Sequence, residues 1–227
     1  MEISIVKEHI KHRFHDYGHE KLLFLFNSSF AIHDSITESY CTGHNVFWNG
    51  HIFGVSVKHF GFHNLSNTIN CAGSMDLVLI IDSSIYRGSY INITYNTELR
   101  IGDEASAMGF VRIDDEFHPR FWSTRLSGKY GEKGHSVTKD SLNITVDPSE
   151  YIFGGASQIN GLSGSAVING YGYTGMAHMI FSPDGSRTSF GMVIPSNFVR
   201  KCAFQNMDRL RKSSDFPDAV IVEPPIF

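Results

Sequence analysis

The sequence contains few cysteines, no long apolar run and no cluster of basic residues, and each absence excludes a class of protein. Three cysteines, Cys41, Cys71 and Cys202, are too few and too widely spaced for a disulfide framework or a zinc site. We therefore expect reduced, partly buried thiols in an intracellular protein. No stretch approaches the roughly 20 apolar residues of a membrane span, and the first residues lack the apolar segment of a signal peptide. The expectation is a cytoplasmic chain without a membrane segment.

Composition and charge describe a globular protein. The 227 residues are 41% hydrophobic and 19% charged, with a formal net charge of −4, which is typical of a folded chain that buries one substantial core. Binding to nucleic acid requires a basic face, and the lysines and arginines form no dense run. We expect no nucleic-acid partner.

Short apolar runs separated by turn residues predict an all-β fold. Strands of this length, broken by Gly, Asn, Asp and Ser, are typical of barrels and sandwiches. Asn49-Gly50 predicts a tight hairpin because both residues tolerate positive φ, and Pro183-Asp184-Gly185 predicts another turn. The runs are 21–26, 46–48, 51–57, 67–71, 77–81, 91–95, 105–110, 120–126, 142–146, 165–168, 172–180 and 189–194.

One helix is predicted near the C-terminal end. Ser196, preceded by Pro195, is a suitable N-cap. Apolar residues then follow near helical spacing, namely Phe198, Val199, Cys202 and Met207. Beyond residue 212 we expect an extended tail.

The segment Gly161-Leu-Ser-Gly-Ser-Ala-Val-Ile168 has the pattern of a catalytic nucleophile on a tight turn. Attack on a carbonyl needs an exposed hydroxyl and two backbone N–H groups directed at the developing oxyanion, and glycines leave room for both. Ser163 is therefore the candidate nucleophile. The N–H groups of Gly161 and Ser163 are the candidate oxyanion hole.

A serine hydroxyl needs a base, and the base works best when a carboxylate orients it. His59 ends the apolar run 54–60, and Asp76 immediately precedes the apolar run 77–81. Asp76 would be costly to bury without a donor, which an imidazole N–H could supply. Other candidates stay open: His63, His51 and His44 for the base, and Asp82 for the acid, whereas Asp103 is interpreted as a turn residue.

From about residue 41 to residue 200 the sequence resembles the chymotrypsin-like serine proteases. The matching segments follow the family's order: Cys41-Thr-Gly43, Val55-Ser-Val-Lys-His59, Asp76-Leu-Val-Leu-Ile80, Ile101-Gly-Asp-Glu-Ala-Ser-Ala-Met-Gly109, Gly161-Leu-Ser-Gly-Ser-Ala-Val167, Tyr173-Thr-Gly-Met-Ala-His178 and Phe190-Gly-Met-Val-Ile-Pro-Ser-Asn-Phe-Val199. Val57 and Lys58 replace the small residues that the family usually carries before its histidine.

The resemblance implies two antiparallel six-stranded β-barrels with a short C-terminal helix and an extended tail. Residues 1–100 would form the barrel with the histidine and the aspartate, and 101–200 the barrel with the serine and the substrate pocket. Residues 201–227 would form the end of the helix and the tail. The short linkers look like those of the main proteases of positive-strand RNA viruses, including the nidovirus group, and also suit an HtrA-type protease domain.

The resemblance also implies a substrate pocket. In viral main proteases a histidine near position 178 donates to the side-chain carbonyl of a substrate Gln or Glu, supported by a hydroxyl such as that of Ser157. Gly175-Met-Ala-His178 has one residue more than the usual Gly-x-His, so a strand histidine packed against aromatics is the alternative for His178. The substrate backbone would add as a strand beside Met179 and the two residues after it.

The resulting prediction is a serine endopeptidase that acts through an acyl-enzyme with a His59–Asp76–Ser163 triad. It would process a viral polyprotein in the host cytoplasm with a Gln or Glu preference, and would need no metal or organic cofactor. Its partner would be a peptide or polyprotein substrate. The alternatives are a catalytically inactive binding module, a cellular HtrA-type protease domain and a β-sandwich structural or capsid protein.

Overall fold

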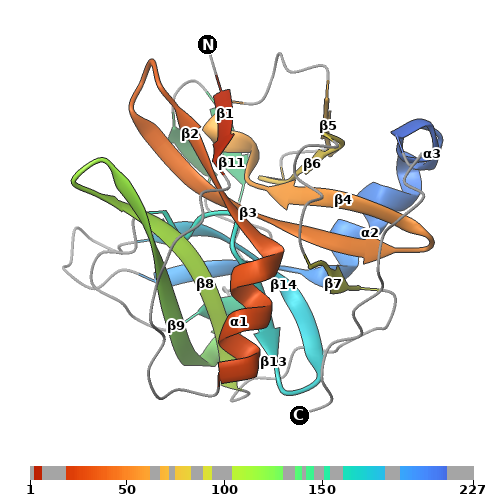
Figure 1. Ribbon diagram of the computed structural model, residues 1–227. Helices are drawn as coiled ribbons and strands as arrows, with labels where there is room; N and C mark the ends of the chain where they lie inside the picture. Colours follow the sequence, from red (N-terminus) through yellow and green to blue (C-terminus); the bar gives the residue numbers. More distant parts are fainter. Residues whose placement is uncertain are drawn as a thin grey trace.

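A computed structural model describes residues 3–6, 19–61, 67–71, 75–82, 89–93, 104–129, 136–139, 142–145, 151–153, 161–181 and 190–213. Most of these residues lie in strands of two large sheets (Figure 1). The first sheet has seven strands, in the spatial order β1 (Ile3–Val6), β2 (Ser29–Asp34), β3 (Ser39–Trp48), β4 (His51–Ser56), β6 (Val78–Ile80) and β5 (Thr68–Asn70), with β7 (Ile91–Asn92) parallel to β3.

The second sheet is a closed barrel of six antiparallel strands. Their order is β12 (Tyr151–Phe153), β15 (Phe190–Pro195), β14 (Gly172–Phe181), β13 (Ala166–Asn169), β8 (Glu104–Ile113) and β9 (Glu116–Lys129). A separate hairpin is formed by β10 (Ser136–Lys139) and β11 (Leu142–Thr145). The two-barrel prediction is confirmed, although the first sheet contains seven strands where we expected six.

One apolar core joins the two sheets. Phe53 and Leu79 from the first sheet and Met108 and Met176 from the second belong to the same cluster of buried side chains. Burial of apolar area is the main favourable contribution to folding, so the sheets stabilise each other. Loops at their junction are thereby held in fixed relative positions.

The predicted hairpin at Asn49-Gly50 is confirmed. Both residues have positive φ, 49° and 84°, and the register places Trp48 opposite His51. Positive φ at both central positions defines a type I′ turn, whose twist matches that of the flanking strands. This turn fixes the register of β3 against β4, the two strands that position the site described below.

The prediction of a strand at residues 21–26 is wrong. These residues lie in helix α1 (His19–Ser28), and the unforeseen strand β2 follows directly. Buried Leu25 and exposed Leu23 show that the helix has one covered face, and the Phe26 ring lies 6.2 Å from that of Phe110 on β8. A short, almost uniformly apolar run has no period that distinguishes a helix from a strand.

Two helices stand where one was predicted, namely α2 (Ser196–Gln205) and α3 (Met207–Ser213). Pro195 occupies the N-cap position, and Ser196 is the first helical residue, not the cap. The break falls at Asn206, whose side-chain amide donates to the Cys202 carbonyl at 2.8 Å. The predicted tail and the turn at residues 183–185 lie outside the described residues.

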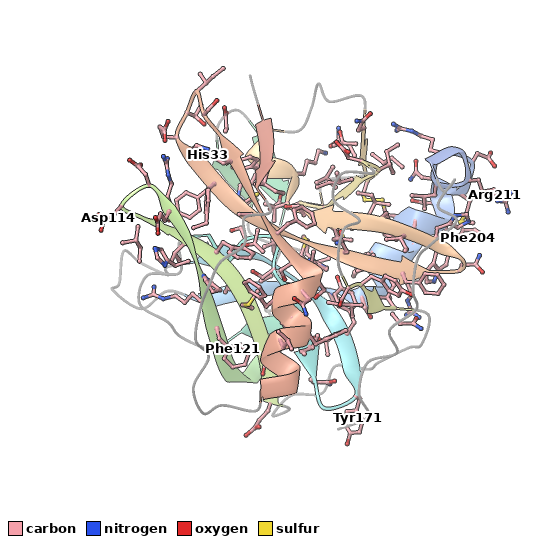
Figure 2. All side chains as sticks on the ribbon, viewed as in Figure 1. His33, Asp114, Phe121, Tyr171, Phe204 and Arg211 are labelled. Atoms are coloured by element: carbon pink, nitrogen blue, oxygen red, sulfur yellow. A yellow bond between two sulfur atoms is a disulfide. The ribbon has the colours of Figure 1, made fainter. Side chains whose placement is uncertain are left out.

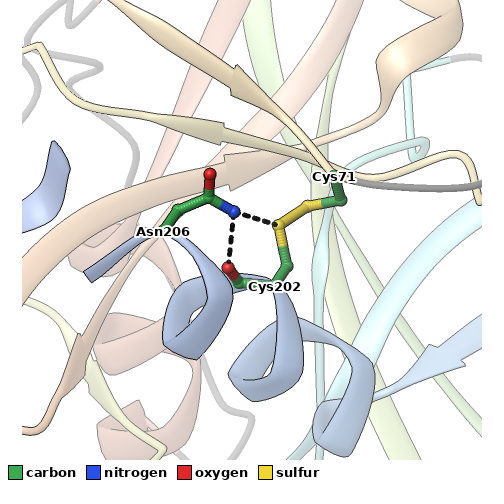
Figure 3. The surroundings of a disulfide bond; sticks show 3 residues. All are labelled: Cys71, Cys202 and Asn206. Atoms are coloured by element: carbon green, nitrogen blue, oxygen red, sulfur yellow. Dashed lines mark hydrogen bonds between the residues drawn. A yellow bond between two sulfur atoms is a disulfide. The ribbon is translucent and has the colours of Figure 1, made fainter. Parts of the chain in front are cut away.

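A disulfide joins Cys71 to Cys202, which corrects the expectation of three reduced thiols. The two residues are 131 positions apart in sequence, yet their Cα atoms are 5.4 Å apart, with Cys71 directly after β5 and Cys202 on α2 (Figure 3). Cys41 is the buried free thiol. Disulfides persist mainly in oxidising compartments, so the bond gives no support to the cytoplasmic location expected from the sequence. The described part of the chain contains no helix with the length and hydropathy to cross a membrane.

A second link between the sheets lies at the tips of two hairpins. Arg112 on β8 donates to Glu38, beside β3, and to Asp115 in the β8–β9 turn, the latter at 2.8 Å. Figure 2 shows His33 on β2 and Asp114 at the β8–β9 tip on the same side of the molecule. Exposed ion pairs of this kind contribute little to the free energy of unfolding. We therefore expect this cluster to fix the position of one hairpin relative to the other.

Replacing both Cys71 and Cys202 by Ala should lower the free energy of unfolding by about 4 kcal/mol, because the bond closes a very long loop in the unfolded chain. Urea denaturation with and without dithiothreitol measures the effect. The reductant should destabilise the wild type and leave the double variant unchanged. An unfolding midpoint of the wild type that does not respond to reductant would contradict the prediction.

Candidate active site

The segment Gly161 to Ser165 forms a tight turn with Ser163 near its apex. The Ser165 N–H donates to the Leu162 carbonyl at 2.9 Å, and Gly164, third in this four-residue turn, has φ of +89°. Positive φ at that position is characteristic of a type II turn and favours glycine. Ser163 at the second position is half-buried, as a hydroxyl that must meet a substrate requires.

Strand β3 holds this turn through three backbone carbonyls of the turn. Thr42 Oγ1 donates to the Gly161 carbonyl at 2.5 Å and the Thr42 N–H to the Ser163 carbonyl at 2.9 Å. His44 Nδ1 donates to the Gly164 carbonyl at 2.8 Å. Since the N–H of a trans peptide points opposite its carbonyl, the N–H groups of Leu162, Gly164 and Ser165 point away from β3. Those of Gly161 and Ser163 donate to no described residue.

Thr42 and His44 are themselves fixed by buried partners. Ser56 Oγ donates to the Thr42 carbonyl at 2.8 Å, and the Phe110 N–H donates to Thr42 Oγ1 at 2.9 Å. The Tyr173 hydroxyl lies 3.0 Å from His44 Nε2, and burial lowers the pKa of His44 to about 4. His44 is therefore neutral near pH 7 and fully buried. It is a structural group in contact with the turn, which argues against its candidacy as the base.

The glycines of the turn are required by close backbone contacts as well as by φ. A Cβ on Gly164 would overlap the Thr42 carbonyl oxygen, and a Cβ on Gly161, whose φ is +86°, would overlap the Phe110 carbonyl oxygen. Neither backbone oxygen can move without breaking the strand that carries it. The glycines therefore allow the turn to lie directly against β3 and β8.

His59 and Asp76 form a tightly bonded pair. His59 lies on the 3₁₀ turn η1 (Lys58–Phe60), immediately after β4. Its backbone N–H donates to Asp76 Oδ1 at 2.7 Å, and its Nδ1 donates to Asp76 Oδ2 at 2.5 Å. With the Nδ1 proton held by the carboxylate, the neutral ring presents Nε2 as its acceptor. This is the tautomer that a general base needs.

Asp76 is a buried anion. It lies in the segment before β6, which the hydrogen bond from the Cys71 N–H to the Leu77 carbonyl closes at 3.2 Å. Burial alone would raise the pKa of Asp76, but hydrogen bonds from His178 and His59 outweigh it and lower this pKa to about 2. The carboxylate is therefore ionised at neutral pH and can accept hydrogen bonds only.

His178, on β14, contacts the same carboxylate. Its side chain is fully buried, and its Nδ1 lies 3.3 Å from Asp76 Oδ2. This contact is not among those predicted from the sequence. The one signal in the sequence is the extra residue before His178. In the structure the register of β14 against β15 shifts at this position, between Ala177 and Met179. Such a bulge redirects a side chain.

A short chain of contacts connects the nucleophile turn to the acid–base pair. The Gly164 N–H donates to the Ala177 carbonyl at 2.6 Å, and the Ala177 N–H donates to the Ser165 carbonyl at 2.9 Å. The next residue, His178, contacts Asp76, which holds His59. The three predicted residues thus converge on one region from three distant parts of the sequence.

The remaining predicted residues are placed as follows. Met179 pairs with Met192 on β15, and Ser157, His63 and Asp103 lie outside the described residues. His51 is the first residue of β4, so the length of that strand separates it from His59. Asp76 precedes β6 and Asp82 follows it, so these two residues lie at opposite ends of that strand. In the described part of the chain no group of three His, Cys, Asp or Glu side chains is arranged to hold a metal ion.

These features define the chymotrypsin-like serine protease fold, with a closed six-stranded barrel and the loops of both sheets meeting at one site. No family model matches the sequence, and no curated protein matches it. Among solved structures, the serine endoprotease from Yersinia pestis is similar with a TM-score of 0.54 and 18% identity, over 88% of this chain and 68% of that one.

Two further solved structures share the fold. The protease domain of MamO from Magnetospirillum magneticum has a TM-score of 0.52 and 13% identity, over 71% of this chain and 86% of that one. An inactive form of Rv3671c from M. tuberculosis has a TM-score of 0.51 and 14% identity, over 84% of this chain and 89% of that one. At these identities the likeness concerns the fold.

The Asp76 carboxylate should make the free energy of unfolding depend on pH in the acidic range. Its pKa is lower in the folded chain, about 2, than the ordinary value of 3.8. The folded state therefore binds this proton less readily than the unfolded state, and the stabilisation present above about pH 4 is lost as the pH falls toward 2. The difference corresponds to about 2 kcal/mol.

Chemical denaturation of the wild type and of Asp76→Asn between pH 5 and pH 2 tests this assignment. We expect the wild type to lose about 2 kcal/mol more than the variant over this range. Parallel pH curves for the two proteins would show that the carboxylate is not the group responsible.

Gly164→Ala should destabilise the fold by about 1–3 kcal/mol, because the added Cβ meets the Thr42 carbonyl and the φ is unfavourable for alanine. Gly170→Ala is the matched control, since no atom lies within 4 Å of a Cβ at Gly170. Thermal unfolding of both variants compares the two positions. Equal unfolding temperatures would contradict the required close contact with β3.

Proposed function

We propose that the protein is a serine endopeptidase in which Ser163 is the nucleophile, His59 the general base and Asp76 the group that orients the imidazole. The observation that carries this proposal is the bond from His59 Nδ1 to the buried, ionised Asp76 carboxylate. It fixes the tautomer in which Nε2 can accept the serine proton. The protease names of two structural neighbours support the same reaction class.

In the proposed mechanism, Ser163 Oγ attacks the carbonyl carbon of the scissile peptide bond while its proton passes to His59 Nε2. Asp76 stabilises the imidazolium that forms. The imidazolium then donates its proton to the leaving amine, and the acyl-enzyme remains. Water, activated by the same imidazole, attacks the ester and releases the second product and free Ser163.

The oxyanion hole proposed for this mechanism consists of the Gly161 and Ser163 N–H groups. Its support is that three carbonyls of the turn are held by β3, while these two N–H groups, on either side of Leu162, donate to no described residue. Donors that are fixed before the reaction stabilise the developing charge without reorganising. The turn thus pairs a nucleophile with nearby donors.

The proposed substrate is a peptide in extended conformation. On one side, Met179 and the two residues after it pair with β15, whereas β13 pairs with β14 only as far as Met176. Beyond Ala177, then, no described strand covers the second edge of β14. An extended peptide could add its backbone there by strand pairing. The sequence predicts the substrate strand at this place, beside Met179.

Preference for Gln or Glu and processing of a viral polyprotein stay predictions from the sequence. The preference depended on His178, whose ring contacts Asp76, and on Ser157, which lies outside the described residues. The three structural neighbours described above come from bacteria, so they favour the HtrA-type alternative as much as the viral one. Val57 and Lys58, which favoured an inactive module, do not displace His59 from Asp76.

Ser163→Ala should reduce peptide cleavage by at least about 1,000-fold and abolish labelling by a fluorophosphonate probe, because no other group can replace the nucleophile. Thermal unfolding should be nearly unchanged.

Ser165→Ala is the matched control for the nucleophile assignment. Its hydroxyl is buried two residues further along and makes no hydrogen bond to a described residue, so the variant should still react with the probe. Labelling of Ser163→Ala at the wild-type rate would overturn the nucleophile assignment.

A further inference from the structure

His178 is a fully buried histidine with an unusual place in the second barrel. It lies at the register shift of β14, between Ala177 opposite Val193 and Met179 opposite Met192. Without the shift, alternation along the strand would place residues 177 and 179 on one face and residue 178 on the other. The shift is the local feature that accompanies the contact of His178 with Asp76 across the junction of the two sheets.

The Asp76 carboxylate receives three N–H donors. Oδ1 accepts from the His59 backbone, and Oδ2 accepts from both His59 Nδ1, at 2.5 Å, and His178 Nδ1, at 3.3 Å. Because an ionised carboxylate only accepts, both imidazoles must carry their proton on Nδ1. The titratable groups that act on this carboxylate are His59 from η1 and His178 from β14.

We propose that His178 is a positioning residue that sets the acidic limit of the enzyme's activity by sharing Asp76 Oδ2 with His59. The inference rests on the function proposed above, and it assigns to His178 a role other than substrate recognition. A carboxylate oxygen that already accepts one N–H is a weaker partner for a second one, and this second partner is the imidazolium of His59.

The physical consequence is a change in when His59 takes up a proton from solvent. A free carboxylate would stabilise the His59 imidazolium strongly and so keep the ring protonated, and unable to act as a base, up to a higher pH. Donation by His178 reduces the charge available on Oδ2. It also fixes the plane of the carboxylate, so that the Asp76–His59 bond keeps its direction. The enzyme thereby stays active at lower pH.

The test uses a fluorophosphonate probe, which needs the same proton transfer as peptide cleavage. Ser163 Oγ forms a bond to phosphorus, fluoride leaves, and the serine proton passes to His59 Nε2. The small probe does not report on recognition of a Gln or Glu side chain, so a role of His178 in a substrate pocket alone would leave its reaction unchanged. The second-order inactivation rate constant is measured from pH 4 to pH 9.

Three variants separate the possible roles. His178→Asn keeps an N–H near the position of Nδ1, His178→Gln carries its amide one bond further out, and His178→Leu removes the donor while filling most of the volume. Relative to wild type, His178→Leu should react about 10-fold more slowly near neutral pH, with its acidic midpoint raised by about 0.5–1 pH unit. His178→Asn should retain the wild-type midpoint and a rate within about 2-fold.

Wild-type rates and midpoint in His178→Leu would overturn this inference and leave the proposed function standing. If His178→Leu fails to fold, the comparison of His178→Asn with His178→Gln decides. Only the Gln variant should show the raised midpoint, and identical profiles would overturn the inference. A wild-type protein that never reacts with the probe would overturn the proposed function itself, and this inference with it.

Discussion

The contact between β3 and the nucleophile turn is the constraint on which the rest of the site depends. Thr42 and His44, from the first sheet, occupy three carbonyls of a turn that lies about 120 residues later in the sequence. A buried carbonyl must be paired, so the carbonyls of Gly161, Ser163 and Gly164 stay on the β3 side and the turn keeps one orientation. Glycine at positions 161 and 164 is a consequence of the same contact, because a side chain would separate the turn from the strand.

The acid–base pair on the first sheet is subject to the same requirement, that a buried polar group must have hydrogen-bond partners. A carboxylate as deeply buried as that of Asp76 is stable only with several donors, and the structure supplies them from η1 and from β14. Since two of its donors come from His59, after β4 of the first sheet, and one from His178 on β14 of the second, the charge of Asp76 links the two sheets at the point where the chemistry is proposed to occur. Displacement of either sheet would remove at least one of the donors to this buried charge.

Much of the fold could be predicted from the sequence because its signals are local. Alternation and turn residues located most strands, and Asn49-Gly50 identified a hairpin by the backbone angles that it tolerates. Residues 21–26 were misassigned because an almost uniformly apolar run has no period. The Cys71–Cys202 pairing could not be predicted, since it depends on where α2 packs after the whole chain has folded.

The candidate site divides in the same way. The triad predictions came from residue type, chain order and resemblance, which suffice to nominate His59, Asp76 and Ser163. The contacts of His44 and His178 could not be predicted, because a buried histidine looks the same in a sequence whether it faces a carbonyl, a carboxylate or a substrate. At His178 the additional residue in the strand was visible as an irregular spacing, but its direction is fixed only by the pairing of β14 with β15.

The disulfide has a consequence for a molecule proposed to cut polypeptides. Cys71 and Cys202 enclose the stretch of chain that contains both Asp76 and Ser163. A single cut by a neighbouring copy at any exposed bond within this stretch would yield two fragments that stay covalently joined. Self-digestion there would pass unnoticed on a non-reducing gel, and the severed molecule would keep its two halves together in one piece.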